Sequence, residues 1–488
     1  MLEDSKEFKE KNNRRSLGAH LTSTEIFLKY IFPEIKNSLN EFLWIDLYAG
    51  EGNLILPILD TIPQEERVDF FKNHIFLFDV QSEMIQKCIE IAKSYKIPID
   101  LAKKNIVQRN SLESFPKFLK SKKYPIFHIT NPPYLYLGYI RKHEDTKIHL
   151  KYFENENEGY QDLYQIAMIN DLRNQIDDLI YIIPANFIFG AAVSNKFRRD
   201  FLKYYKILKM YVFETKIFEF TGTNIVIVFF KRKNYPKTEI QEFTGTKFKK
   251  LDKTFKREYF LNPKFNYRGG SEFDDFCEKN KSTKPLEVKY YIRKEDVWNN
   301  KGNYHVDVID TSSYVSNEYL KTTLYINEEF SKKVKSNLLY IRTVDTGSYE
   351  GRAGLYYIKD NFNVDGIYVS GNTYRTSPIH VFLEPTLSKE EQILLREFFN
   401  LILEYYRKRL DSEFLTTYKY SEAEYTRKYL GLTQVRKLIG TYPILSNENS
   451  LKTNLIKIIK EENAGNLIAF IKKVNKHPLS IEKLTDWL

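Results

Sequence analysis

Short apolar runs alternate with amphipathic segments along the first 232 residues. The apolar runs end in Gly, Pro, Asn or Asp, which is typical of buried strands. The amphipathic segments repeat apolar residues every three or four positions, as helices do. We predict strands at 42–48, 74–78, near 106, 126–129, 179–183, 207–213 and 224–230, with helices at 24–35, 81–94 and 160–173 and one beginning at 54–59. Strands alternating with helices indicate an α/β fold with a mostly parallel sheet.

The last of these strands differs from the others in its connection. Thr221-Gly222-Thr223 separates Ile217–Phe220 from Asn224–Phe230, which is a spacing typical of a hairpin. A hairpin joins antiparallel neighbours, so one strand must run against the rest. The prediction is a seven-stranded, mostly parallel sheet with a late antiparallel hairpin.

The pattern changes after residue 236. Helical segments give way to short β-like runs between charged turns, and residues 246–385 read as a mixed, mostly β region. An amphipathic helix is predicted at 388–410. We therefore divide the chain into a charged lead-in (1–17), an α/β domain (18–240) and an α+β domain (241–488).

Asn131-Pro132-Pro133-Tyr134 ends the predicted strand 126–129. Proline cannot donate to a strand ladder, and it holds the backbone rigid. The Asn131 amide and the Pro132 carbonyl can then offer two oxygen acceptors to an –NH2 group, and Tyr134 offers a flat face beside them. This arrangement suits a planar amine. The tetrapeptide alone also leaves open a proline-rich turn without a chemical role.

Ala49-Gly50-Glu51-Gly52 lies between a predicted strand and a predicted helix. Glycines allow a tight turn and let a ligand approach the backbone. Asp46, near the end of the strand, would repel a pyrophosphate but attract an ammonium group. That favours S-adenosylmethionine over NAD or ATP, and a purely structural turn is the alternative.

Two further polar residues follow predicted strands. Asp79 ends the strand 74–78, where a carboxylate can bind both hydroxyls of a ribose. It can equally cap the helix 81–94. Asn110 follows the weaker strand near 106 and can hydrogen-bond an adenine edge.

Composition adds little. The net charge of +11 permits an anionic partner, but the chain is rich in Lys, Ile, Asn, Tyr and Phe, a bias that an AT-rich genome also produces. Cys88 and Cys277 lie far apart, which argues against a zinc site or disulfide framework and suits a reducing cytosol. The lead-in lacks the apolar core of a secretory signal, and 179–193 is too short to span a bilayer. We expect a cytoplasmic protein without a metal.

The order of these motifs resembles the N6-adenine DNA methyltransferases of bacterial type II restriction–modification systems, in the gamma arrangement. The resemblance covers about residues 14–232. It is carried by GAHLTS, DLYAGEG, Asp79, NPPY, IPANF and the Phe218 region, in that order. It implies a class I S-adenosylmethionine-dependent methyltransferase fold followed by a target-recognition domain.

The resemblance also implies roles for individual residues. Ser23 stands where the family often has proline, and Asn110 where it usually has aspartate. Phe218 would stack on the flipped adenine opposite Tyr134, and Phe220 is its alternative. The cofactor-binding residues implied are Thr22, Asp46, Ala49, Gly50, Gly52, Asp79 and Asn110, and the catalytic residues are Asn131, Pro132 and Tyr134.

The implied partners are double-stranded DNA and, genetically, a cognate restriction endonuclease, with no membrane and a monomeric state. Arginine in the second domain can grip guanine edges bidentately. Candidates in loops flanked by glycines are Arg342, Arg352, Tyr374 and Arg375. Ordinary surface charge or phosphate contact is the alternative for each.

Other readings use the same residues. Methyltransferases acting on protein glutamine or on the N2 of RNA guanine share the NPPY chemistry, but such enzymes lack a large C-terminal domain. Glu287-Val288-Lys289 has the ExK spacing of a metal nuclease, without a convincing acidic partner upstream. A non-catalytic DNA-binding protein is disfavoured because NPPY and the Gly-rich turn are intact.

Overall fold

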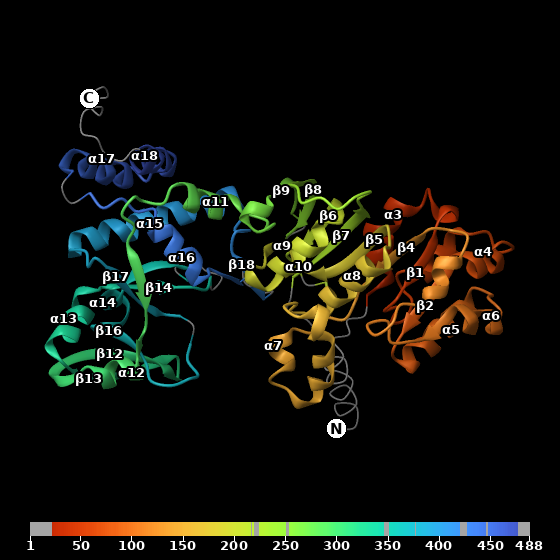
Figure 1. Cartoon of the computed structure of the whole chain (residues 1–488), viewed down its shortest axis with the longest axis horizontal. Coiled ribbons are helices and arrows are strands. Elements are labelled where there is room, and N and C mark those ends of the chain that lie inside the picture. The colour runs from red at the N-terminus through yellow and green to blue at the C-terminus, as the bar shows by residue number, and fades with distance from the viewer. Residues whose placement is uncertain are drawn as a thin grey trace. The chain divides into compact units, whose positions relative to one another are not determined.

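The computed structural model describes residues 22–215, 217–218, 224–249, 253–345, 351–375, 377–419, 427–445 and 448–476. The chain forms two compact units, Met1–Gly269 and Gly270–Leu488, each of which is described by itself (Figure 1).

The N-terminal unit is built on one nine-stranded sheet with the strand order β3-β2-β1-β4-β5-β7-β6-β8-β9. Strands β1 to β5 are mutually parallel, and β7 runs antiparallel to both β5 and β6. The central strands are buried on both faces, which explains their continuous apolar runs. The strands are β1 Leu43–Asp46, β2 Ile75–Asp79, β3 Ile106–Gln108, β4 Ile126–Thr130, β5 Asp178–Pro184, β6 Tyr205–Phe213, β7 Ile225–Arg232, β8 Gln241–Phe248 and β9 Thr254–Leu261.

Two expectations about this sheet are wrong. It has nine strands instead of seven, because β8 pairs in parallel with β6 and β9 pairs with β8. The first compact unit therefore extends to Gly269 and not to residue 240. The charged turn after β7 looked like a linker, but the chain continues into two more strands of the same sheet.

The antiparallel hairpin is present with a different first strand. Strand β6 pairs with β7, with Phe213 opposite Ile225. Ile217 and Phe218 lie outside β6 and β7, and Phe220 is outside the described residues. Aromatic and β-branched residues favour strands, but here they occupy the connection instead.

Helices flank the sheet. Helices α5 and α6 pack against β2 and β3. The segment 24–35 is helical as predicted, with a π-helical turn at Phe27–Ile31, but the segment at 56–61 is a 3-10 helix. The α-helices are α2 Thr24–Ile26, α3 Phe32–Ile35, α4 Arg67–His74, α5 Ser82–Ser94, α6 Ile99–Asn105, α7 Leu137–Ile140, α8 Leu163–Asn174, α9 Asn186–Phe189 and α10 Ala192–Leu202.

Short 3-10 helices connect several of these elements. They are η2 Leu39–Glu41, η3 Leu56–Thr61, η4 Lys117–Ser121, η5 Glu144–Phe153, η6 Asn155–Asn157 and η7 Pro263–Phe265. The segment between β4 and α8 contains α7, η5 and η6 and supplies one wall of the cavity described below.

The strand order reverses between β1 and β4, and this reversal marks the expected position of a ligand-binding site. The chain runs outward from β1 through β2 to β3 and then returns to β4 on the other side of β1. Ligands of open α/β sheets bind at the carboxyl ends of strands where the order reverses in this way. That point lies between β1 and β4, where Asp46 ends one strand and Asn131 follows the other.

The C-terminal unit contains two four-stranded sheets, ordered β10-β17-β14-β15 and β11-β16-β12-β13, and the small sheet β18-β19. Helix α15 buries one apolar face in the core of this unit and begins with a capping box between Ser388 and Glu391. The strands are β10 Glu287–Tyr290, β11 Ile292–Arg293, β12 Lys301–Val315, β13 Glu318–Ile326, β14 Leu339–Arg342, β15 Gly354–Tyr357, β16 Gly366–Val369, β17 Ile379–Glu384, β18 Thr416–Lys419 and β19 Arg427–Tyr429. The helices are α11 Glu272–Lys279, α12 Lys294–Asn299, α13 Glu328–Ser336, α14 Ile358–Phe362, α15 Lys389–Arg409, α16 Leu432–Ile439, α17 Asn449–Lys460 and α18 Ala464–Lys476. The predicted mixed α+β character agrees with these elements.

Candidate active site

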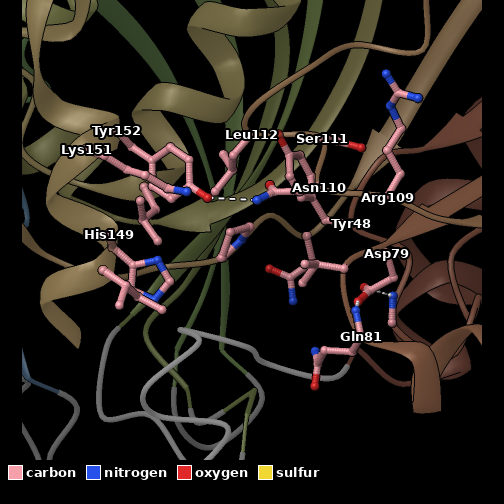
Figure 2. Close-up of a pocket in the computed structure, with 16 residues that line it drawn as sticks. Tyr48, Asp79, Gln81, Arg109, Asn110, Ser111, Leu112, His149, Lys151 and Tyr152 are labelled. Carbon is pink, nitrogen blue, oxygen red and sulfur yellow. Dashed lines mark hydrogen bonds between the residues drawn. The ribbon is translucent and has the colours of Figure 1, made fainter. Parts of the chain in front are cut away.

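Residues that follow four neighbouring strands of the N-terminal unit surround one cavity of about 250 Å³. Gly50 follows β1, Asp79 ends β2, Asn110 follows β3 and Asn131 follows β4, and all four line it. Figure 2 shows Asp79, Asn110 and Tyr48 around this space. The four separate sequence motifs therefore meet at one site, as their positions at strand ends predicted.

The Gly-rich turn is tied to the next strand. The Gly50 N–H donates to Asp79 Oδ2 at 2.9 Å, and the Ala49 N–H donates to the Phe78 carbonyl at 2.8 Å. Gly52 has φ +82°, and a Cβ there would lie 2.7 Å from Leu56 Cδ1. Only glycine accepts both the conformation and the close approach without strain, so Gly52 shapes the turn.

Asp79 uses both carboxylate oxygens to bind the backbone. Oδ2 accepts from Gly50, and Oδ1 accepts from the Gln81 N–H at 2.8 Å. Burial raises the pKa of Asp79, while these N–H donors lower it. Each carboxylate oxygen has a second lone pair, so the side chain can order the start of α5 and still accept from a ligand.

Asp46 lies beneath the turn and is 1% exposed. Its Oδ1 accepts from the Thr130 hydroxyl at 2.6 Å and from the Tyr48 N–H at 2.9 Å. Burial raises the pKa of Asp46 to about 7, against the lowering effect of the hydrogen bonds from Thr130 and Tyr48. The carboxyl group is thus poised to change charge near neutral pH.

A second, smaller cavity of about 20 Å³ adjoins the first. Thr22, Asp46 and Ala49 line it, and it shares Tyr48, Gly50 and Asn131 with the larger cavity. The residue expected from the first motif block therefore does lie beside the Gly-rich turn. Asn53 secures it, because Asn53 Nδ2 donates to the Thr22 carbonyl at 2.9 Å.

Asn131 connects the first block to the NPPY motif. Its Nδ2 donates to Thr22 Oγ1 at 2.9 Å, and its Oδ1 accepts from the Tyr134 hydroxyl. The Tyr134 oxygen also lies 2.7 Å from the Ile182 carbonyl on β5. These contacts fix the amide between two motifs that are far apart in the sequence.

Three predicted residues lie in the packing around the cavities instead of lining them. Tyr134 is 9% exposed and Phe218 is 5% exposed, and both belong to the core of the N-terminal unit. Pro132 is buried. Neither Tyr134 nor Phe218 is among the residues lining the two cavities, so their stacking on a base stays a prediction.

Sequence reasoning missed one wall of the larger cavity. Ile148, His149, Lys151 and Tyr152 line it, and all four come from η5. Figure 2 shows Tyr152 joined to Asn110 by a hydrogen bond, which is 2.8 Å long. A 3-10 helix follows neither the helical nor the strand period, so periodicity gave no signal for this segment.

A buried hydrogen-bonded group under the site was also missed. The Leu47 N–H donates to His128 Nε2 at 3.1 Å, and His128 Nδ1 lies 2.6 Å from Asp171 Oδ2. Because Nε2 must accept, the ring proton sits on Nδ1 and is donated to Asp171. The Tyr181 hydroxyl donates to the same oxygen at 2.6 Å. A histidine inside an otherwise apolar strand was the available signal.

The C-terminal unit places the four predicted DNA-contact residues in different settings. Arg375 lies over the Tyr314 ring at 3.9 Å, and Arg342 lies over the Tyr356 ring at 4.9 Å. Tyr374 meets Tyr291 edge to face, with ring centroids 5.7 Å apart. All three lie beside aromatic rings.

Arg352 differs from these three. Its Nη1 lies 2.7 Å from both carboxylate oxygens of Glu404, and its side chain is 16% exposed. Contact with a base would cost Arg352 this ion pair, and its role in DNA binding stays a prediction.

Residues 43–218 match the family described as Eco57I restriction-modification methylase. The structure of the Type IIL restriction-modification enzyme MmeI in complex with DNA is similar over 95% of this chain and 76% of that one, with TM-score 0.51 and 12% identity. A nuclease-deletion mutant of the Type ISP enzyme LlaGI with a DNA substrate mimic is similar over 91% of this chain, with TM-score 0.47 and 10% identity. No curated protein sequence matches significantly.

The family match is confined to residues 43–218, and the structural match shows a fold shared with MmeI. The chain spans 46% of the LlaGI chain and 36% of a matched DrdV chain. Within the described residues, no group of three or more His, Cys, Asp or Glu side chains could hold a metal ion. Among those same residues, no helix is long and apolar enough to cross a membrane.

Proposed function

We propose that the chain is a site-specific DNA adenine-N6 methyltransferase of the gamma arrangement that uses S-adenosylmethionine and protects DNA from a cognate restriction endonuclease. The observation that carries the proposal is the position of Asn131. It follows β4 at the point where the strand order reverses and lines both cavities beside Gly50.

The residues around the cavities fit the proposed cofactor. Asp79 can accept from ribose hydroxyls, Asn110 can pair with the adenine edge, and Asp46 can receive the ammonium group beside Thr22. When bound, S-adenosylmethionine supplies an electrophilic methyl group. Gly50 and Gly52 let the backbone approach this ligand closely.

The target base would be held by the NPPY motif. Adenine in a duplex must be flipped out, which costs a few kcal/mol in order of magnitude. Asn131 Oδ1 and the Pro132 carbonyl would accept the two N6 hydrogens and turn the nitrogen lone pair toward the methyl donor. Positioning is the main contribution, because the cofactor is already reactive.

Stacking on the flipped base would involve Tyr134 and Phe218. Stacking on an aromatic ring is worth about 1–3 kcal/mol per base. Both rings are less than 10% exposed, at 9% and 5% respectively, so we expect them to move when DNA binds.

Sequence recognition would be the task of the C-terminal unit. Arg342, Tyr374 and Arg375 are the proposed contacts, because their side chains lie beside rings that can orient them toward bases or phosphates. The shared fold with MmeI, whose structure is a complex with DNA, supports this proposal.

The test is detection of methylated adenine. DNA from a host expressing the chain should carry N6-methyladenine in one recurring sequence, and the purified chain should transfer labelled methyl groups to the same sequence. Asn131→Ala should abolish the signal, whereas Asn73→Ala should preserve it, because the Asn73 amide donates to Asp69 and lines neither cavity. Methylation of protein or RNA without DNA methylation would refute the proposal.

A further inference from the structure

A chain of hydrogen bonds leads from the surface to Asn110 in the larger cavity. Lys151 Nζ lies 2.5 Å from Glu113 Oε1, and the Tyr152 hydroxyl lies 3.3 Å from the same oxygen. Asn110 Nδ2 donates to the Tyr152 oxygen at 2.8 Å, the contact drawn in Figure 2. Asn110, Lys151 and Tyr152 all line the cavity.

The side chain of Glu113, at the surface, sets the donor and acceptor of each hydrogen bond in this series. The hydrogen bond from Lys151 lowers the pKa of Glu113, so this side chain is a carboxylate and can only accept. Burial raises the pKa of Tyr152, so the phenol keeps its proton and donates it to Glu113. The phenol oxygen then accepts, and it selects the NH2 end of the Asn110 amide.

This polarity decides what Asn110 offers a ligand. An isolated asparagine can present either a donor or an acceptor by turning its amide over. With Nδ2 held by Tyr152, the remaining amide atom is the oxygen Oδ1. An oxygen acceptor matches the exocyclic amine of adenine and rejects the carbonyl oxygen of hypoxanthine or guanine.

We infer that Tyr152 and Glu113 are positioning residues that turn the Asn110 amide into a fixed acceptor and thereby make the cavity selective for an adenine nucleoside over its 6-oxo counterpart. The inference rests on the proposed function, because it takes S-adenosylmethionine as the ligand. It explains how asparagine serves where the resembling family usually has aspartate: the relay supplies the acceptor polarity that a carboxylate has by itself.

The test compares two ligands that differ at one position of the base. Calorimetry on the full chain would measure its affinities for S-adenosylhomocysteine and for S-inosylhomocysteine. We expect the wild type to prefer the adenine ligand by at least about a hundredfold, because a site that leaves buried polar groups unpaired rejects an analogue strongly. Tyr152→Phe should reduce this ratio by about tenfold or more, because the amide can then turn over.

Two further variants separate positioning from general damage. Tyr152→Phe combined with Asn110→Asp should regain the adenine preference, because a carboxylate needs no partner to be an acceptor. Tyr95→Phe is the matched control, since its hydroxyl also binds a carboxylate, that of Asp60, at 3.0 Å but does not line the cavity. It should leave the ratio unchanged.

The outcomes distinguish the inference from the proposed function. Failure of the wild type to bind S-adenosylhomocysteine would overturn the proposed function. Wild-type binding with an unchanged ratio in Tyr152→Phe would overturn the inference alone. Should Tyr152→Phe fail to fold, Glu113→Gln answers the same question from a side chain that is 48% exposed: an amide there can donate to Tyr152, and the ratio should again fall.

Discussion

The two units of this chain organise their polar residues in opposite ways. In the N-terminal unit the candidate site is made by residues that directly follow strands, so short motifs such as NPPY each deliver one group to a common edge. In the C-terminal unit, polar and aromatic residues meet through pairs that are far apart in sequence. Arg293, for example, lies over the ring of Tyr374, at 5.8 Å from its centroid.

Local motifs predict the position of a polar residue in the first unit and not in the second. A parallel sheet brings all strand ends to the same edge, so the position of a residue in its own strand predicts its place in the site. Two small sheets joined by loops give no such rule. The local sequence around an arginine in these loops therefore does not predict which residues it contacts.

The first prediction concerns the buried hydrogen bonds that support the strand ends of the N-terminal unit. His128→Leu should lower the free energy of unfolding by about 3–5 kcal/mol, because it takes one hydrogen-bond partner from each of two buried groups, the Asp171 carboxylate and the Leu47 N–H. Chemical denaturation measures this. Tyr181→Phe, which removes the other donor to the same oxygen, should cost about 1–2 kcal/mol.

An unfolding free energy for His128→Leu within about 1 kcal/mol of wild type would contradict this account, since one net hydrogen bond is worth about that much. It would mean that the network of Leu47, His128 and Asp171 does not hold the end of β1. The strand-end site would then depend on backbone pairing alone.

The second prediction concerns the chemistry at the strand end. Asn131→Ala should lower methyl-transfer turnover by at least about a hundredfold, which corresponds to about 3 kcal/mol from one preorganised contact. Its oxygen accepts a proton that becomes more acidic as the new bond forms, so the contact strengthens along the reaction. Turnover and the affinities for DNA and cofactor would be measured separately.

Normal turnover in Asn131→Ala would contradict the assignment of the catalytic motif. A rise in KM without a change in turnover would instead show that the amide serves ground-state binding. Because Asn131 also donates to Thr22, Thr22→Val is the companion variant. It removes that acceptor and should weaken cofactor binding while keeping the target-base acceptor.

The sequence predicted the fold of the N-terminal unit better than its extent. Strand ends at Asp46, Asp79 and Asn131 could be predicted because prolines, glycines and carboxylates interrupt apolar runs there. The continuation into β8 could not, because its alternation follows a charged turn that looks like a linker. Tyr152 could not be found either, since its 3-10 helix carries no periodic pattern.

A third prediction sharpens the contrast within the C-terminal unit. Arg375→Ala should weaken discrimination against one altered base pair by about 1–3 kcal/mol, the range for a bidentate contact. Arg352→Ala should lower thermal stability but leave the methylated sequence unchanged, because its partner is Glu404. Sequencing of methylated adenines in a randomised DNA library measures the sequence preference of both variants, and thermal denaturation measures their stability.

The matched pair makes this test decisive, since each variant removes one arginine from the same unit. A changed methylated sequence in Arg352→Ala, with Arg375→Ala unaffected, would reverse the assigned roles. It would also show that ion pairing inside the unit does not identify structural arginines.

The last prediction is a pH dependence that separates the two units. Burial raises the pKa of Asp46 to about 7, and only its ionised form attracts an ammonium group. Below this pKa the carboxyl group is protonated, and cofactor binding must first release that proton. Affinity for S-adenosylhomocysteine should therefore rise about tenfold from pH 6 to pH 8, as one titrating group allows. Calorimetry over this pH range checks it.

Two carboxylates of the C-terminal unit are shifted in the opposite direction. Hydrogen bonds from Lys289 and Lys332 lower the pKa of Glu384 and Glu328, so neither changes charge between pH 6 and pH 8. DNA affinity should therefore vary less with pH than cofactor affinity does.

Because Asp79 also has a raised pKa, Asp46→Asn is the necessary control: it should weaken cofactor binding and flatten the pH profile of that binding. A profile that keeps its slope in Asp46→Asn would assign the titration to another group and remove Asp46 from the ammonium site.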